Sequence, residues 1–238
     1  MRILPSQEIM KTDFYKYQAQ TTPHPLALEV SHAKGCYIYD TEGKKYLDFI
    51  AGVSAISLGH CHPKIISAVK NQLDKYLHVM VYGEFIQEPA VELTKLLSRF
   101  LPENLTTTYL TNSGTEAIEG SMKLARRATG RKEIIYAKNA YHGNTMGALS
   151  IMGVEERKEI FQPLLPDCNS IEFNNEKDIL KITSKTAGVV LETIQGGAGF
   201  IVPENNYLKK VKNRCSEVGA LLILDEIQPG FGRTGKLF

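Results

Sequence analysis

The stretch LLILDEIQPGFGRTGKLF, from Leu221 to Phe238, decides the fold because it joins a short apolar run to an acidic pair. The run at 221–224 holds only leucine and isoleucine, which is typical of a strand buried on both faces of a parallel sheet. Asp225 and Glu226 follow at its carboxyl end, where open α/β sheets bind ligands. Asp225 is therefore a candidate to pair with a cationic ring nitrogen. An acidic residue that caps a turn is an equally good interpretation of this stretch alone.

A second stretch, YLTNSGTEAIEGSMKLARRATG at 109–130, predicts a strand that leads into a capped helix. Tyr109 and Leu110 are expected to end the strand. Ser113 is the expected N-cap, and Glu116 three residues later completes a capping box. The apolar residues at helical spacing, which predict the buried face, are Ile118, Met122 and Ala125.

The start of this predicted helix is also a candidate phosphate site. Ser113, Gly114 and Thr115 would offer free backbone N–H groups, two hydroxyls and the positive end of the helix dipole. Gly114 has no side chain, so an anion could approach the backbone closely. An ordinary capped helix without a ligand is the alternative.

Two more loops follow expected strands. NAYHGNTMGALS at 139–150 comes after the expected strand at 133–137, and its Tyr141 offers a flat aromatic face for a planar cofactor. A packed core tyrosine and, for His142, a hydrogen-bonded loop histidine are the alternatives. GVVLETIQGGAGF at 188–200 gives another buried strand with Glu192 at its end, either a site carboxylate or a solvated one.

In this order, NSGTEAIE, YHG, ETIQG and LILDEIQPGFGRTGK resemble the class III (omega) aminotransferases, which are pyridoxal-phosphate enzymes. The resemblance begins near Thr22 and runs to Phe238. It implies an α/β fold of the fold type I class, in which a mainly parallel sheet flanked by helices forms the large domain. It also implies transfer of an amino group from an amino acid or omega-amine to a 2-oxo acid, with pyridoxal 5′-phosphate as cofactor, normally in a homodimer.

The resemblance assigns binding roles to five residues that surround the cofactor. Ser113, Gly114 and Thr115 would hold the cofactor phosphate. Tyr141 would stack on one face of the pyridine ring, and Ile227 would pack against the opposite face.

The resemblance also assigns roles to four polar side chains. Asp225 would pair with the protonated ring nitrogen, and Gln228 would approach the phenolic oxygen. Glu192 matches a family glutamate that holds an arginine from the later part of the chain. His142 lies in the same loop as Tyr141 and is counted with the cofactor-binding residues.

Two departures from the family pattern affect function. Asn144 stands where several members that act on ornithine derivatives carry an arginine, so the charge that grips a substrate carboxylate is missing, which argues against an acetylornithine-type substrate. The family's Schiff-base lysine lies beyond the GRTGK turn, and Lys236 belongs to that turn. We therefore expect an amino-terminal portion that is incomplete at the carboxyl end of its sheet and inactive alone. The alternative is a non-catalytic pyridoxal-phosphate or phosphate-binding protein of the same fold.

Residues 1–56 are expected to form the amino-terminal segment of a small α+β domain, with strands at 37–39 and 46–49, and residues 57–238 the large cofactor-binding domain. Among the 238 residues the net charge is only +2 and the basic residues are dispersed, so we expect no nucleic-acid partner. The amino terminus shows no signal segment and no apolar run is long enough to span a membrane, so we expect no membrane partner.

The four cysteines are scattered and form no CxxC pair, which favours a reducing cytoplasm. His60, Cys61 and His62 supply too few ligands for a structural zinc site. We therefore expect a loop there and no metal.

Overall fold

The computed structural model describes residues 6–80 and 82–238, and the chain divides into two compact units, Met1–Tyr82 and Gly83–Phe238. The first unit holds an antiparallel sheet in the order β1-β2-β3. Its elements are α1 (Ser6–Tyr17), β1 (Val30–Lys34), β2 (Tyr37–Asp40), β3 (Lys45–Leu47) and α2 (Pro63–Leu73). The domain boundary predicted after Ile56 falls inside this unit and stays a prediction.

The turn between β2 and β3 is organised by Asp40. Its carboxylate accepts the N–H groups of Glu42 at 3.0 Å and Lys44 at 2.8 Å, and the hydroxyl of Tyr46 at 2.9 Å. The strands predicted at 37–39 and 46–49 are thus confirmed as β2 and β3, although β3 ends at Leu47 and β1, which pairs with β2, was not expected from the sequence.

The second unit holds four strands in the order β5-β4-β6-β7, and all neighbours are parallel. The strands are β4 (Glu133–Ala137), β5 (Cys168–Ile171), β6 (Thr186–Glu192) and β7 (Leu221–Asp225). The α-helices are α3 (Glu88–Ser98), α4 (Gly114–Thr129), α5 (Met146–Ser150) and α6 (Tyr207–Val218). Short 3-10 helices are η1 (Glu155–Arg157), η2 (Glu159–Phe161) and η3 (Glu176–Lys181). This arrangement confirms the predicted parallel α/β class. None of the described helices is both long enough and apolar enough to cross a membrane.

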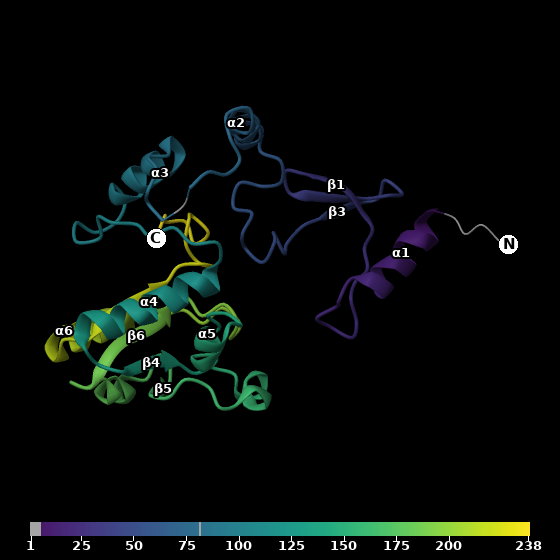
Figure 1. Ribbon diagram of the computed structural model, residues 1–238. Coiled ribbons are helices and arrows are strands. Elements are labelled where there is room, and N and C mark those ends of the chain that lie inside the picture. The colour runs from purple at the N-terminus through teal and green to yellow at the C-terminus, as the bar shows by residue number, and fades with distance from the viewer. Residues whose placement is uncertain (1–5, 81) are drawn as a thin grey trace. The chain divides into compact units, whose positions relative to one another are not determined.

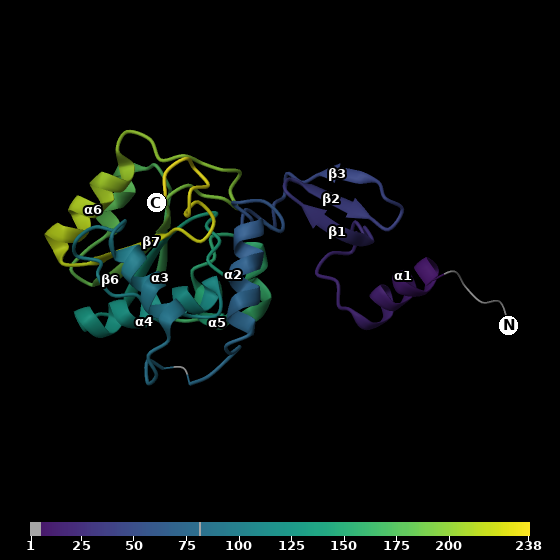
Figure 2. The same ribbon diagram turned by 90° about the horizontal axis from the view of Figure 1, so that it is seen from above.

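Helices cover both faces of the parallel sheet (Figures 1 and 2), with α4 and α5 on one face and α6 and η3 on the other. Successive strand residues point to opposite faces, so Ile134 packs with the α4 cluster and Ile135 with the α6 cluster. The three residues of α4 that were predicted to be buried are each at most 3% exposed. These residues are Ile118, Met122 and Ala125.

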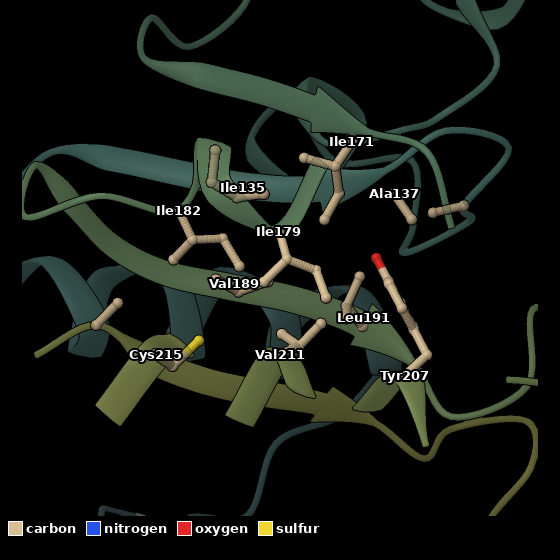
Figure 3. Packing of buried hydrophobic residues seen from close by; sticks show 12 residues of the cluster. Ile135, Ala137, Ile171, Ile179, Ile182, Val189, Leu191, Tyr207, Val211 and Cys215 are labelled. Atoms are coloured by element: carbon tan, nitrogen blue, oxygen red, sulfur yellow. The ribbon is translucent and has the colours of Figure 1, made fainter. Parts of the chain in front are cut away.

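The α6 side of the core is formed mainly by branched aliphatic side chains (Figure 3). Val211 of α6 packs in one cluster with Val189 and Leu191 of β6, and all three are fully buried. Each such side chain contributes about 1.5–3 kcal/mol when it is removed from water. This packing covers β6, which lies between β4 and β7 in the sheet.

At the amino ends of the strands, Arg131 joins three backbone segments. Its Nη1 donates to the carbonyls of Thr186 at 3.0 Å, Val218 at 2.9 Å and Gly219 at 3.0 Å. One guanidinium thereby joins the turn before β4 to the start of β6 and the end of α6.

Two predictions for the edge of the sheet are wrong. Tyr109 and Leu110 form no strand, and they are 79% and 49% exposed. Leu221 and Leu224 of β7 are 40% and 43% exposed, so β7 is not buried on both faces. Both results have one reason. β7 pairs only with β6, and no strand within 6–80 or 82–238 pairs with the other edge of β7.

Replacement of Met122 by alanine should lower the free energy of unfolding by about 2–5 kcal/mol, because it leaves a cavity between α4 and the sheet. Leu124→Ala on the same helix is the matched control, since Leu124 is 64% exposed against 3% for Met122. We expect a change within about 0.5 kcal/mol for the control. Urea titrations of the purified variants measure both values. Equal losses would show that the buried face of α4 is wrongly assigned.

The buried thiol of Cys215 should resist thiol reagents. Burial raises the pKa of Cys215 to about 11, whereas Cys36 and Cys61 are exposed. At about pH 8 we expect Cys215 to be labelled at least about 100-fold more slowly than these two, because the thiolate is the reactive form. Mass spectrometry of timed samples measures each rate, and Cys215→Ser identifies the slow site. Labelling of Cys215 at the rate of Cys36 would contradict this burial.

Candidate functional site

The carboxyl ends of β4, β6 and β7 lie at one edge of the sheet and carry the predicted site residues. The parallel register places Glu192, the last residue of β6, opposite Asp225, the last residue of β7. The loop after β4 contributes Tyr141 and His142. Residues from three separate sequence stretches therefore meet where open α/β sheets bind ligands.

Asp225 and His142 form a buried pair at the centre of this edge. Asp225 Oδ2 lies 2.7 Å from His142 Nδ1, and the two side chains are 4% and 0% exposed. Asp225 Oδ1 accepts the N–H of Ile227 at 3.0 Å. A carboxylate has about four acceptor positions, so Asp225 keeps capacity for another donor.

The other ring nitrogen of His142 has no protein partner. His142 Nε2 is buried and makes no hydrogen bond with any residue in the described part of the chain. Buried polar atoms nearly always have a partner. An unpaired one at a strand-end site is therefore a reason to expect a ligand or an ordered water nearby.

The amino end of α4 has the features of an anion site. Ser113 is the N-cap, and its Oγ accepts the N–H of Glu116 at 3.2 Å, as predicted. The Glu116 carboxylate accepts the N–H of Asn112 at 2.9 Å, one residue before the position of the usual capping box. Among the described residues, the N–H groups of Gly114 and Thr115 have no hydrogen-bond partner, which leaves them for an anion.

Gly114 brings this helix end against the residues that follow β7. A Cβ at Gly114 would lie 2.7 Å from Ile227 Cδ1, closer than real Cβ contacts. Ile227 and Tyr141 are 57% and 41% exposed, so each has apolar surface available for a ring. The candidate phosphate site thus lies against Ile227, which follows Asp225 by two residues in the chain.

Glu192 holds two loops of the site in place. Its Oε1 accepts the N–H of Tyr141 at 3.1 Å, and its Oε2 accepts the N–H of Gly196 at 2.8 Å. The side chain is buried, and this burial raises the pKa of Glu192. Both carboxylate oxygens are therefore engaged by backbone groups, and the predicted pairing with an arginine stays a prediction.

A glycine after β6 allows one of the remaining site side chains to approach. Gln228 lies so close to Gly196 that a Cβ at that position would collide with its Oε1. A Cβ at Gly197 would lie 3.4 Å from Tyr141 Cβ, which is an ordinary contact. Of these two glycines, only Gly196 is therefore needed for a site side chain, Gln228, to approach.

Sequence reasoning missed three polar residues that support the site. Gln195 is 1% exposed, and its Nε2 donates to the carbonyl of Lys138 at 2.9 Å. Glu119 and Thr145 form a hydrogen-bonded group with Thr115. Glu119 follows Thr115 by four residues on α4, a helical spacing that indicates a shared face, but nothing in the sequence links either residue to Thr145.

The donor set fits a flat, phosphorylated ring with a protonated nitrogen. Free N–H groups at a helix start suit the phosphate, and a buried carboxylate with spare acceptor capacity suits the ring nitrogen.

In the other unit, His60 Nε2 lies 2.7 Å from Asp48 Oδ2, and Cys61 is exposed. No group of three or more metal-binding side chains occurs in the described ranges.

Comparisons with known proteins agree with this geometry. A model of the family described as Aminotransferase class-III matches residues 17–238. The acetylornithine aminotransferase of Clostridium acetobutylicum is 44% identical over 212 residues, which cover 86% of this chain and 54% of that protein.

Solved structures show the same fold. The adenosylmethionine-8-amino-7-oxononanoate aminotransferase of Methanocaldococcus jannaschii superposes with a TM-score of 0.90 at 30% identity, over 98% of this chain and 58% of that one. The taurine:2-oxoglutarate aminotransferase of Bifidobacterium kashiwanohense, solved in complex with PLP and glutamate, superposes with a TM-score of 0.85 at 28% identity, over 100% and 59%.

The chain spans about half the length of the curated relatives it matches. The family match covers nearly all of the chain, and the aligned region contains every residue of the site described above. The chain therefore belongs to the class III aminotransferase family.

Proposed function

We propose that the protein is a pyridoxal-phosphate-dependent aminotransferase that moves an amino group from an amino acid or omega-amine to a 2-oxo acid. The observation that carries this proposal is the buried Asp225–His142 pair beside the open amino end of α4. The names of the related proteins support it. We leave the amino donor as a class, because the exposed Asn144 supplies no charge for a substrate carboxylate.

The amino end of α4 would hold the cofactor phosphate. The unpaired N–H groups of Gly114 and Thr115 and the hydroxyl of Ser113 are the donors, and the helix dipole favours the anion. Tyr141 would cover one face of the ring and Ile227 the other, since both have exposed apolar surface at this edge.

Asp225 would hold the proton on the ring nitrogen. When bound, the protonated pyridine ring supplies an electron sink that makes it easier to remove a proton from the α carbon of the amino compound. His142 would orient the Asp225 carboxylate through the 2.7 Å hydrogen bond, so the charge faces the ring nitrogen. Gln228 would approach the phenolic oxygen. For Glu192 we propose a positioning role, because its oxygens hold the Tyr141 loop and the Gly196 turn.

We place the Schiff-base lysine outside residues 1–238, as the family resemblance implies. We also propose a homodimer, on the same resemblance, and a cytoplasmic location, which the four free cysteines favour. The proposed partners are the small-molecule donor and acceptor. The dispersed charge gives no basis for a nucleic-acid partner.

Asp225→Asn should lower kcat by about 100-fold or more, because the amide keeps the size of the side chain but removes the charge that holds the ring nitrogen protonated. The matched control is Glu226→Gln, which neutralises the neighbouring carboxylate. We expect less than about a threefold change for the control. Steady-state kinetics with a panel of amino donors measures both. Similar losses in the two variants would show that Asp225 has no special role.

Borohydride reduction of the cofactor-loaded protein, followed by peptide mapping, should place the pyridoxyl group on a single lysine beyond Phe238. Lys236→Ala should leave this labelling unchanged. A pyridoxyl group on Lys236 would contradict the placement of the lysine. Cofactor binding without any labelled lysine would favour the alternative of a non-catalytic binding protein.

A further inference from the structure

Glu119 gathers three hydrogen bonds on one carboxylate oxygen. Its Oε1 accepts the hydroxyl of Thr145 at 2.7 Å and the N–H groups of Gly147 at 2.8 Å and Ala148 at 3.1 Å. These two N–H groups belong to the first turn of α5, whose N–H groups have no partner within the helix. A residue of α4 therefore caps α5.

The Thr145 hydroxyl also lies 2.6 Å from the Thr115 hydroxyl, so one hydrogen must lie between these two oxygens. A hydroxyl has one hydrogen to donate, and a carboxylate has none. Thr145 gives its hydrogen to Glu119. The hydrogen between the two hydroxyls must therefore come from Thr115.

The two hydroxyls at the amino end of α4 therefore differ in what they can donate. Thr115 commits its hydroxyl hydrogen to Thr145 and keeps only its backbone N–H for an anion. Ser113 Oγ accepts from the Glu116 N–H, which leaves its own hydrogen free to donate. Only one of the two hydroxyls can therefore donate to a phosphate.

The same group fixes the loop after β4 against α4. A Cβ at Gly143 would collide with Thr115 Oγ1, and one at Gly147 would collide with the Glu119 carboxylate. Gly143 also has a backbone φ of +134°, a conformation that residues with a side chain rarely adopt. Both glycines are needed for this close contact, and His142 precedes the first of them directly in the chain.

We propose that Glu119 is a positioning residue of the site. Through Thr145 it turns the Thr115 hydroxyl hydrogen away from the phosphate, and it clamps the loop that carries Tyr141 and His142 onto α4. The phosphate part rests on the proposed function. The clamp does not, because it consists of contacts within the protein alone.

Hydrogen exchange of the cofactor-free protein tests the clamp. Glu119→Ala should speed exchange of the Gly147 and Ala148 amides by about tenfold or more, because both lose their acceptor. Glu119→Gln keeps one acceptor oxygen and should give a smaller increase. Glu116→Ala on the same helix is the control and should leave these amides within about twofold. Unchanged exchange in Glu119→Ala would overturn the clamp.

Calorimetry with pyridoxamine 5′-phosphate tests the hydroxyl assignment. This probe has the phosphate but no aldehyde to react with a lysine. Ser113→Ala should weaken binding by about tenfold or more, whereas Thr115→Val should weaken it by no more than about threefold. Equal or larger loss in Thr115→Val would overturn the assignment. If the unaltered protein does not bind this probe, the phosphate site and the hydroxyl assignment both fail, while the exchange experiment still decides the clamp.

Discussion

A buried carboxylate is stable only when hydrogen bonds replace the water it has lost, and this requirement at Asp225 organises the site. His142 and the N–H of Ile227 meet it, one from the loop after β4 and the other from the turn after β7. For His142 to reach Asp225, its loop must be held in place. Glu192 holds the loop from β6, and Glu119 holds it from α4.

The three carboxylates at this edge of the sheet therefore divide between two tasks. Glu192 and Glu119 accept backbone N–H groups and fix the shape of the loops. Asp225 accepts one backbone N–H and one imidazole, and it retains capacity for a ligand. The parallel register of β6 and β7 places Glu192 and Asp225 side by side, so the fold itself determines this division.

Local patterns in the sequence predicted the elements that build this edge. The apolar runs located β6 and β7, and the capping residues located the start of α4 at Ser113. The buried face of α4 followed from helical spacing. Tyr141, Glu192 and Asp225 were found because each lies at or just after the end of a strand, and the carboxyl ends of parallel strands share one edge. The roles assigned to them came from the family resemblance and not from these patterns.

Interactions between distant residues could not be predicted in this way. Thr145 and Glu119 are 26 positions apart, and their contact depends on how α5 packs against α4. The strand expected at Tyr109 and Leu110 failed for a related reason, because a strand needs a paired neighbour and its own residues do not supply one. Periodicity describes one element at a time, whereas these features belong to pairs of elements.

Nitrogen-15 NMR tests the central claim most directly. The protein is loaded with pyridoxal phosphate that is labelled at the ring nitrogen. If Asp225 holds the proton, its carboxylate should raise the pKa of the ring nitrogen, so the bound nitrogen should show the chemical shift of a protonated pyridine at about pH 8. Asp225→Ala should convert it to the shift of the neutral ring. A neutral ring in the unaltered protein, or a protonated one that persists in Asp225→Ala, would contradict the role of this carboxylate.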